Sequence, residues 1–256
     1  MQESKIPDII KYFDNAAVNR NKEIASDPIV DYEQKTRSAM VIGLLNPQKG
    51  EKILEIGCGN ARDLTLISVY GCHCVGIDIS PGMLDEARHD LAAAGISDVE
   101  LEVGSATALR FADATFDKVF ASEVIEHIPE YEKCIAEMAR VVKPGGSVVI
   151  TTPNRRSWYG FDRYILFEGV LRQQWKHPYD SWKTYVEVAG TLERAGLTVT
   201  TVRGICYVPG FLIPLIFLRF FNKIIVHITA LAEPILSLHF PKKGYMLGLL
   251  SKKKHN

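Results

Sequence analysis

Residues 53–63 read Ile-Leu-Glu-Ile-Gly-Cys-Gly-Asn-Ala-Arg-Asp, an apolar run that meets a Gly-x-Gly turn and continues into a helical pattern. Asp78 closes the next apolar run along the chain. Glycines at 57 and 59 permit a sharp turn and let the backbone approach a ligand, while an acidic residue at the next strand end accepts hydrogen bonds from ribose hydroxyls. The stretch therefore predicts a nucleoside site built from two neighbouring strand ends.

The residues after the turn bear on the kind of nucleoside. A dinucleotide-binding turn has a third glycine at position 62, where it admits a pyrophosphate at the helix N-terminus, but this chain has Arg62. A Gly-x-Gly pair alone is also common in tight turns without a ligand. A nicotinamide cofactor is therefore disfavoured, although an NAD(P)-dependent oxidoreductase stays an alternative.

Three further motifs follow in order. Phe116-Asp117 opens a strand, Ser122 to Ile128 reads Ser-Glu-Val-Ile-Glu-His-Ile, and Val142-Lys143-Pro144-Gly145-Gly146 precedes the next strand. With these motifs, residues of about 50–155 resemble the class I S-adenosylmethionine-dependent methyltransferases. The pattern is closest in look to the branch that methylates quinone precursors, sterols and other small molecules.

The resemblance implies S-adenosylmethionine as the cofactor. Glu55 would receive its ammonium, Asp78 its ribose hydroxyls, and Ile79 and Met83 would enclose its adenine. Alternatively, Glu55 makes a structural hydrogen bond to the turn, and the two apolar residues belong to the core. The full predicted set of cofactor-binding residues is Glu55, Gly57, Cys58, Gly59, Asn60, Asp78, Ile79, Met83, Ser105, Ala106, Ser122 and Glu123.

The chain departs from the family pattern at two positions. Family members often have glycine where this chain has Ala61, and aspartate where it has Ser105. Alanine is a mild change if the backbone angle φ is negative there, and a serine hydroxyl still accepts a hydrogen bond. In the family an N-terminal tyrosine or arginine often meets the methionine carboxylate, which makes Tyr32 and Arg37 candidates.

The segment Glu123-Val124-Ile125-Glu126-His127 contains the candidate catalytic residues. We predict His127 as a general base, since histidine titrates near neutral pH, with Glu126 beside it. Two alternatives are a motif that only contacts the cofactor and packs the next helix, and a divalent metal held by Glu123, Glu126 and His127. Our prediction includes no metal.

Two segments are expected on the acceptor side of the sheet. Residues 153–182 are rich in aromatic and basic groups and follow a strand end, so we expect a lid over the cofactor that contacts substrate through Asn154, His177 and Tyr179. The alternative is a packed surface hairpin. Residues 205–240 form an apolar insertion interrupted by Pro214, which disfavours a membrane-spanning helix.

For this insertion we expect an interfacial or pocket-forming pair of helices. Arg219, Lys223 and Lys242-Lys243 lie beside apolar residues and suit an anionic membrane surface and a lipid-like substrate. The alternative is a helical cap that buries its own apolar side.

Composition limits the cellular setting and the partners. The chain has 256 residues, 47% of them hydrophobic, and its 30 basic and 30 acidic side chains cancel, so nothing favours a nucleic-acid partner. The start lacks the pattern of a signal peptide, and we expect a cytoplasmic protein, peripheral on the inner face of a membrane if the insertion binds lipid. Five cysteines without Cys-x-x-Cys spacing are predicted as core thiols.

Apolar runs near 52–56, 73–77, 99–103, 117–121, 147–151, 198–203 and 245–250 alternate with helical patterns near 33–45, 62–70, 81–94, 131–142 and 181–195. This alternation predicts an α/β fold. We expect a Rossmann-like, seven-stranded, mostly parallel sheet with helices on both faces and a helical insertion before the last strand. Residues 1–45 would form an N-terminal helical cap and residues 46–256 the methyltransferase domain.

The predicted function is methyl transfer from S-adenosylmethionine to a small, lipid-like or quinone-type acceptor. The alternatives are the oxidoreductase and a non-catalytic module that binds the cofactor and acts through partners.

Overall fold

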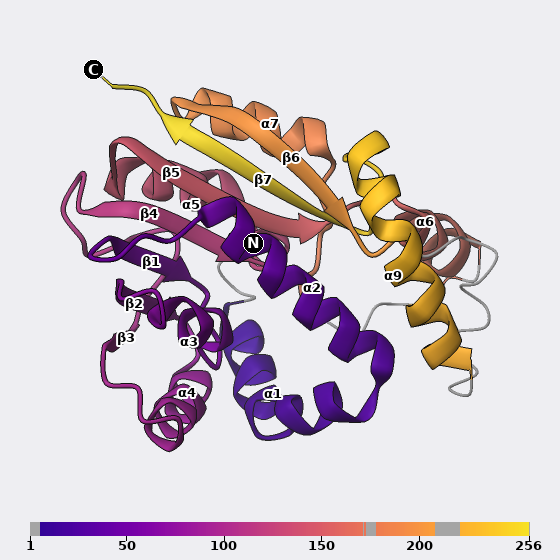
Figure 1. Ribbon diagram of the computed structural model, residues 1–256, viewed down its shortest axis with the longest axis horizontal. Helices are drawn as coiled ribbons and strands as arrows, with labels where there is room; N and C mark the ends of the chain where they lie inside the picture. Colours follow the sequence, from indigo (N-terminus) through magenta and orange to yellow (C-terminus); the bar gives the residue numbers. More distant parts are fainter. Residues whose placement is uncertain (1–5, 171, 173–177, 208–220, 256) are drawn as a thin grey trace.

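Seven strands form one sheet in the order β3-β2-β1-β4-β5-β7-β6 (Figure 1). The first five strands pair in parallel, and β7 lies antiparallel between β5 and β6. This computed structural model describes residues 6–170, 172, 178–207 and 221–255, and the fold predicted from the sequence is confirmed. The strands are β1 (Lys52–Ile56), β2 (His73–Asp78), β3 (Val99–Val103), β4 (Phe116–Ser122), β5 (Val142–Pro153), β6 (Leu197–Ile205) and β7 (Met246–Lys253).

Helices cover both faces of the sheet because each face of the buried parallel strands is apolar. One core cluster joins the strands to α5 and α7, and a second joins them to α2, α3 and α4. All five cysteines are buried, as predicted. The helices are α1 (Ile6–Ser26), α2 (Pro28–Leu45), α3 (Arg62–Ser68), α4 (Pro81–Ala93), η2 (Ile125–His127), α5 (Tyr131–Val141), α6 (Trp158–Phe161), the π-helix η3 (Asp162–Val170), α7 (Tyr185–Arg194) and α9 (Asn222–His239).

Local capping sets where the helices begin. Ser80 accepts a hydrogen bond from the Met83 amide at 3.1 Å and starts α4, as its Ser-Pro signal predicts. The helix expected from residue 181 begins four residues later, because Thr184 and Glu187 form a reciprocal capping box.

The N-terminal segment contains two helices that are joined to the sheet in different ways. α2 packs on the second core cluster, whereas α1 crosses toward α4 (Figure 1). Asp14 on α1 accepts hydrogen bonds from the Ser80 hydroxyl at 2.5 Å and the Gly82 amide at 3.0 Å. These contacts fix α1 beside the carboxyl end of β2.

α9 lies beside α6 at one end of the molecule and packs on α2 and β6 (Figure 1). Its Glu233 carboxylate accepts hydrogen bonds from the Cys206 amide at 2.8 Å and the Tyr32 hydroxyl at 3.0 Å. α9 therefore provides part of the helical insertion expected before the last strand, while residues 208–220 lie outside the described residues. Among the described helices, none combines the length and the apolar character needed to cross a membrane.

Candidate cofactor and acceptor site

A cavity of about 1360 Å³, measured out to its open mouth, lies at the carboxyl ends of β1, β2 and β4. This is the edge at which open α/β sheets bind ligands. The structure brings every predicted cofactor-binding residue into its wall, although their contact with a cofactor stays a prediction. These residues are Glu55, Gly57, Cys58, Gly59, Asn60, Asp78, Ile79, Met83, Ser105, Ala106, Ser122 and Glu123.

The turn after β1 depends on its two glycines for different reasons. Gly57 has φ of 66°, and a Cβ there would lie 2.5 Å from a methyl carbon of Val124. Gly59 has φ of 52°, and a Cβ there would meet no atom within 4 Å. The first glycine therefore allows close packing against the segment after β4, and the second leaves backbone open to the cavity.

Ala61 also adopts the left-handed backbone conformation, with φ of 57°. Sequence reasoning expected alanine to be a mild change if this angle were negative, and that condition does not hold. A side chain in this conformation costs about 1 kcal/mol relative to glycine. The strain lies in the turn that begins α3, directly beside the cavity.

Asp78 is oriented by the backbone of both strand ends. One carboxylate oxygen accepts a hydrogen bond from the Gly59 amide at 2.8 Å, and the other accepts one from the Ser80 amide at 2.9 Å. These two amides hold the carboxylate at the cavity wall, where the sequence predicts a contact with ribose hydroxyls.

A group of buried charged side chains forms one end of the cavity. Glu55 is 3% exposed, and burial together with the Asp63 carboxylate raises its pKa well above the usual range. Burial raises the pKa of Glu123 to about 8. Arg37 extends from α2 into this group and donates to the Gln34 side chain at 2.6 Å.

Four polar side-chain atoms of the cavity wall lack hydrogen-bond partners among the described residues: Glu55 Oε2, Glu123 Oε1, Arg37 Nε and Arg62 Nε. Glu55 Oε2 and Arg37 Nε are an acceptor and a donor among them. An unpaired buried charge is costly, so such atoms indicate a ligand that supplies the partners. An ammonium and a carboxylate on one carbon, the end of an amino acid, match this pair. The side chains present therefore fit a cofactor that ends in methionine.

The opposite end of the cavity is less polar. Met83 is 1% exposed and Ile79 half-buried, and both lie in the wall as expected for the adenine side. The Ser105 hydroxyl lies 3.0 Å from the Thr107 hydroxyl, so this short polar segment is internally bonded. The hydroxyl group stands where the resembling family often has aspartate.

Residues from α1, which belongs to the predicted N-terminal helical cap, line the cavity. Ile6, Ile9 and Phe13 are in the wall, and the Phe13 ring meets the His127 ring edge-on at 5.5 Å between centroids. The signal in the sequence was the recurrence of apolar residues at helical spacing in this segment. Residues missed by the sequence prediction therefore come mainly from this helix and from the segment after His127.

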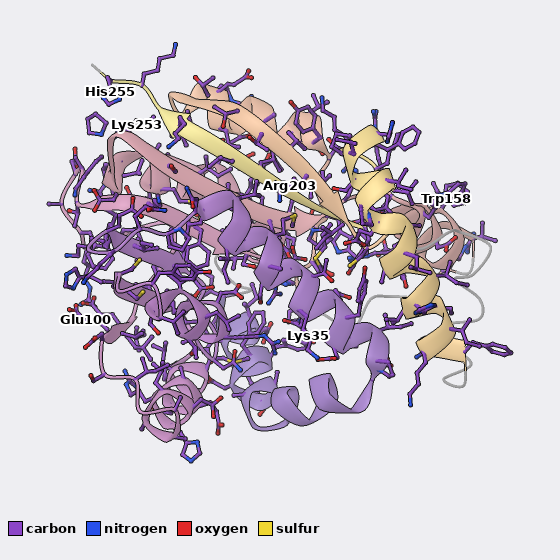
Figure 2. The ribbon with its side chains drawn as sticks, in the orientation of Figure 1. Lys35, Glu100, Trp158, Arg203, Lys253 and His255 are labelled. Carbon is purple, nitrogen blue, oxygen red and sulfur yellow. The ribbon has the colours of Figure 1, made fainter. Side chains whose placement is uncertain are left out.

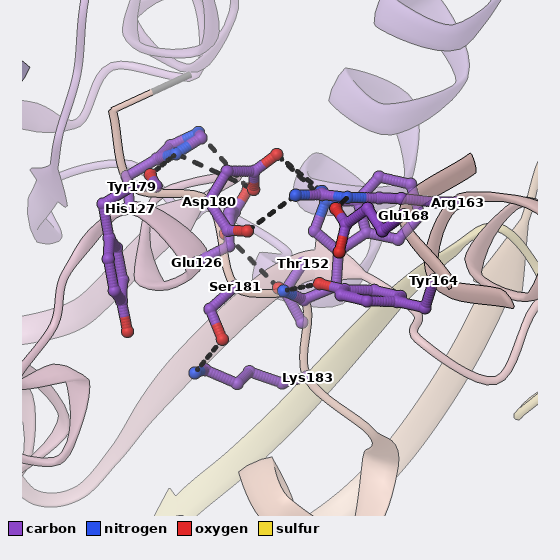
Figure 3. A network of polar contacts seen from close by, with 11 residues as sticks. Glu126, His127, Thr152, Arg163, Tyr164, Glu168, Tyr179, Asp180, Ser181 and Lys183 are labelled. Atoms are coloured by element: carbon purple, nitrogen blue, oxygen red, sulfur yellow. Dashed lines mark hydrogen bonds and ion pairs between the residues drawn. The ribbon is translucent and has the colours of Figure 1, made fainter. Parts of the chain in front are cut away.

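His127 lies between the cofactor cavity and the segment before α7, in the network of Figure 3. Its Nδ1 is 3.2 Å from the Tyr179 carbonyl and 3.9 Å from Asp180 Oδ1. On its other side, Nε2 is 3.9 Å from Glu126 Oε1. A hydrogen bond from Nδ1–H to the carbonyl would place the basic lone pair on Nε2, the nitrogen that faces Glu126.

Arg163 anchors the part of this network that comes from the predicted lid. Its guanidinium is 4% exposed and donates to the Asp180 carboxylate at 2.6 Å and to the Asp180 carbonyl at 2.7 Å (Figure 3). It also lies over the rings of Tyr164 and Trp182, at 5.0 and 4.7 Å from their centroids. A bidentate, stacked arginine holds its partner rigidly. Asp180 is thereby fixed next to His127.

Glu126 and Glu123 have separate surroundings. Glu126 is 1% exposed, accepts a hydrogen bond from the Thr152 hydroxyl at 3.3 Å, and is not in the cavity wall. Burial, together with the nearby Glu123 carboxylate, raises its pKa well above the usual range and favours its neutral form. The described residues include no group of three metal-ligating side chains placed to hold an ion, the Glu-Glu-His segment included.

Glu123 adopts an uncommon backbone conformation, with φ of 57°. Its amide donates to the Thr151 carbonyl at 3.2 Å and the Thr151 hydroxyl at 3.1 Å, which holds the residue in place. Strain of about 1–3 kcal/mol at such a residue is typical of functional sites.

The three predicted substrate residues differ in what the structure shows of their contacts. Asn154 is buried, and its amide donates to the carbonyls of Lys242 and Gly244 at 3.2 and 3.0 Å, so it joins two chain segments and lies away from the cavity. Tyr179 contacts His127 through its carbonyl. His177 lies outside the described residues. Substrate contact by these residues stays a prediction.

Tyr32 and Arg37, the two candidates for contact with the methionine carboxylate, line different cavities. Arg37 lines the cofactor cavity, while the Tyr32 hydroxyl donates to Glu233 on α9 and lines a different cavity. Of the two, only Arg37 has the position expected for a contact with the methionine carboxylate.

Two smaller cavities, of about 310 and 690 Å³ measured out to their open mouths, lie between α6 and α9, and the smaller one also contacts α2. Both are lined by Tyr159, Cys206 and Tyr245, and the two tyrosine rings are 4.8 Å apart. Glu33 lines the smaller one and acts electrostatically on Arg37 and Glu123. Glu33 therefore connects the smaller cavity electrostatically to the charged end of the cofactor cavity.

Several known methyltransferases are similar to this chain in sequence or fold. Residues 54–150 match the family model described as a methyltransferase domain. The chain is 29% identical over 216 residues to the demethylmenaquinone methyltransferase of Bacillus pumilus, an alignment that covers 77% of this chain and 92% of that one. It is 30% identical over 171 residues to the enzyme of the same name from Bacillus cytotoxicus, covering 65% and 71%.

A solved S-adenosylmethionine-dependent methyltransferase from Mesorhizobium loti has a similar fold. The TM-score is 0.60 at 18% identity, and the match covers 84% of this chain and 96% of that one.

Proposed function

The chain belongs to the class I S-adenosylmethionine-dependent methyltransferases, and we propose that it methylates a small quinone-type acceptor, with the cofactor in the cavity at the ends of β1, β2 and β4. The observation that carries the proposal is the pair of unpartnered atoms, Glu55 Oε2 and Arg37 Nε, in one cavity wall. The cofactor supplies an electrophilic methyl group on a sulfonium. The side chains described below bind it and position the acceptor.

The charge of the cavity supports this cofactor over a dinucleotide. Glu55, Asp63 and Glu123 all act on Arg37, and the buried carboxyl groups of the first and third have raised pKa values. A ligand with an ammonium group and a sulfonium lowers the free energy of such carboxylates, whereas a pyrophosphate meets their repulsion. Glu55 would bind the ammonium, Arg37 the carboxylate, and Asp78 the ribose hydroxyls.

An acceptor related to quinones fits the relatives and the aromatic cavities. The curated relatives are named demethylmenaquinone methyltransferases. The rings of Tyr159 and Tyr245 beside Cys206 offer an apolar, aromatic wall. A planar ring stacks favourably on such side chains. The acceptor would therefore enter from the α6 and α9 side.

His127 is the proposed general base. The acceptor atom that gains the methyl group loses a proton, and the Nε2 lone pair of His127 would accept it. The Tyr179 carbonyl fixes the other nitrogen, and the Asp180 carboxylate lies close enough to stabilise the imidazolium. Positioning of the acceptor and exclusion of water supply the remaining rate enhancement.

Calorimetric titration of the purified chain with S-adenosylhomocysteine, with NADH as the competitor, tests the cofactor. Micromolar binding of S-adenosylhomocysteine alone supports the proposal, and binding of NADH alone contradicts it. Turnover is then measured with the quinol of a short-tailed naphthoquinone that lacks the ring methyl group. A product heavier by one CH₂, formed only with S-adenosylmethionine, identifies the acceptor class.

A further inference from the structure

One face of α9 is apolar and exposed along its whole length. Ile224, Ile228, Leu231, Ile235 and Leu238 are between 44% and 77% exposed. Their alternating spacing of four and three residues places them within an arc of about 80° and along about 21 Å of the helix. We call these five residues the α9 stripe. Contiguous exposed apolar surface of this kind marks an interaction site.

The stripe faces outward because the opposite face of α9 is anchored. Asn222, Ile225, Thr229 and Glu233 are buried, and Glu233 accepts hydrogen bonds from the Cys206 amide and the Tyr32 hydroxyl. A buried carboxylate that bonds to two elements is costly to displace. α9 therefore presents the stripe without rearrangement.

The charges around the stripe have one sign. Lys223 precedes it, and Lys242 and Lys243 follow it, all three exposed. Between residues 222 and 243 the sequence has a single acidic residue, Glu233, which is buried. An apolar strip flanked by exposed lysines matches an anionic lipid surface, where apolar burial and electrostatic attraction act together.

The apolar surface continues beyond the helix. Phe240 is 55% exposed directly after α9, and Trp158 is 61% exposed on the neighbouring α6, at the α9 side of the molecule (Figure 2). The larger aromatic cavity is lined by both of these residues. Its wall therefore reaches the same surface as the α9 stripe.

We propose that the α9 stripe, with Lys223, Lys242 and Lys243, docks this protein onto an anionic lipid bilayer, with α9 lying in the plane of the interface. A second copy of the chain is the competing occupant, since the spacing of the stripe also suits a coiled-coil seam. Pairing of two copies would bring Lys223 close to the partner's lysines in either orientation, and no exposed acid on the helix would compensate them. Charge therefore favours the lipid surface.

Docking has a consequence that rests on the proposed function. The aromatic cavity lined by Trp158 and Phe240 would open toward the lipid, and an acceptor with an apolar tail would reach it without crossing water. The docking itself depends only on the α9 stripe and its lysines, so it can be tested separately from methyl transfer.

Vesicle flotation of the full chain tests the proposal. Vesicles of phosphatidylcholine are compared with vesicles that also contain phosphatidylglycerol. We expect flotation only with the anionic vesicles, and weaker binding at higher salt because exposed charges are screened. Leu231→Glu combined with Ile235→Glu should weaken binding about tenfold or more, since two charges would enter the apolar part of the interface.

Val186→Glu is the matched control, because Val186 on α7 is exposed to the same 67% as Leu231 but lies outside the stripe. It should leave flotation unchanged. Lys242→Glu combined with Lys243→Glu gives a second variant that retains the stripe and should reduce binding to the anionic vesicles alone. Thermal melting and S-adenosylhomocysteine titration of each variant report whether it is folded.

Failure of the folded, intact chain to float with anionic vesicles would overturn the proposal. A dimer in gel filtration that the stripe variant converts to a monomer would overturn it in favour of a second copy. Absence of S-adenosylhomocysteine binding by the intact chain would contradict the proposed function, while the flotation result would still decide the docking.

Discussion

Glu55 Oε2 and Arg37 Nε line the same cavity from different elements, the end of β1 and the middle of α2, and each is a buried polar atom without a hydrogen-bond partner among the described residues. Each atom is costly in isolation, and an amino-acid zwitterion would satisfy both. Under the proposed function, their pairing across two elements would make α2 part of the cofactor site.

Glu55→Gln should weaken S-adenosylhomocysteine binding about 10- to 100-fold, because a charged hydrogen bond to the ammonium is worth about 1.5–3 kcal/mol. Burial raises the pKa of Glu55, so an arriving ammonium should displace a proton from it. Calorimetry in two buffers of different ionisation enthalpy measures that proton.

The proton release should decrease in Glu55→Gln and persist in Glu100→Gln, an exposed control on β3 at the far edge of the sheet (Figure 2). Unchanged affinity in Glu55→Gln would instead assign Glu55 to the turn alone.

The ligand-free protein should become less stable as the pH rises from about 5 to about 8. Burial raises the pKa values of Glu55, Glu123 and Glu126 above the unfolded value of about 4.3, that of Glu123 to about 8. The folded chain then holds protons that the unfolded chain has released, so the free energy of unfolding falls through this window. Thermal melting over the pH range measures the effect.

Glu123→Gln should make the melting temperature depend less on pH between about pH 5 and about pH 8. The lowered pKa values of Asp117 and Glu137 act below the ordinary range of carboxyl groups and leave this window unaffected. A melting temperature that rises from pH 5 to pH 8 would contradict the assignment.

Asp78→Ala should weaken cofactor binding by about 1–3 kcal/mol if its carboxylate accepts the ribose hydroxyls. Because the same carboxylate holds the Gly59 and Ser80 amides, part of any loss would come from the turn. Titration with an analogue that lacks the ribose hydroxyls separates the two effects. Equal losses for both ligands would limit Asp78 to supporting the turn, and Asp85→Ala, an exposed aspartate, is the control.

The sequence was sufficient to predict which residues lie at the strand ends. It was insufficient to predict which residues of the N-terminal helices cover these ends. Glu55, Gly59 and Asp78 follow from the spacing of motifs along consecutive strands, and the structure brings them into one wall. Tyr32 and Arg37 were taken together, yet residues five apart on a helix point about 140° apart, so a single face cannot carry both. A prediction that placed both residues on one helix would have shown that only one of them can reach the methionine carboxylate.

The acceptor side was less predictable for a physical reason. Asn154, Arg163 and Asp180 act through contacts with chain segments that are distant in sequence, and no periodic pattern records such contacts. The lid was predicted from the aromatic and basic composition of residues 153–182, which gives no indication of which side chain bonds to which. Local patterns therefore predicted the cofactor side in detail and the acceptor side only as a region.

His127→Ala should reduce kcat by a larger factor than it weakens S-adenosylhomocysteine binding, if Nε2 accepts the proton of the acceptor. General-base contributions are about 100- to 10,000-fold in rate. The comparison of turnover with calorimetric affinity on the same preparation decides between a base and a cofactor contact. Equal losses in both quantities would favour the contact, since His127 also lines the cofactor cavity.

Asp180→Asn should move the acidic limb of the kcat/KM profile to lower pH. The variant keeps the size of the side chain but removes a negative charge 3.9 Å from His127 Nδ1, and an imidazolium is less stable without a neighbouring carboxylate. Protonation of the base would then begin at lower pH. Activity with the naphthoquinol measured across the acidic range, at saturating S-adenosylmethionine, records the limb.

The same substitution removes the ion pair between Arg163 and Asp180 and leaves only the one with Glu168, so a lower melting temperature is expected as well. Arg163→Gln distinguishes the two effects, because it retains the Asp180 charge while it removes the anchor. Arg163→Gln should therefore lower kcat, because Asp180 and His127 are positioned less firmly. It should not move the acidic limb of the kcat/KM profile to lower pH. A limb that stays in place in Asp180→Asn would show that the carboxylate does not act on His127, and the network would then serve only to fold the lid.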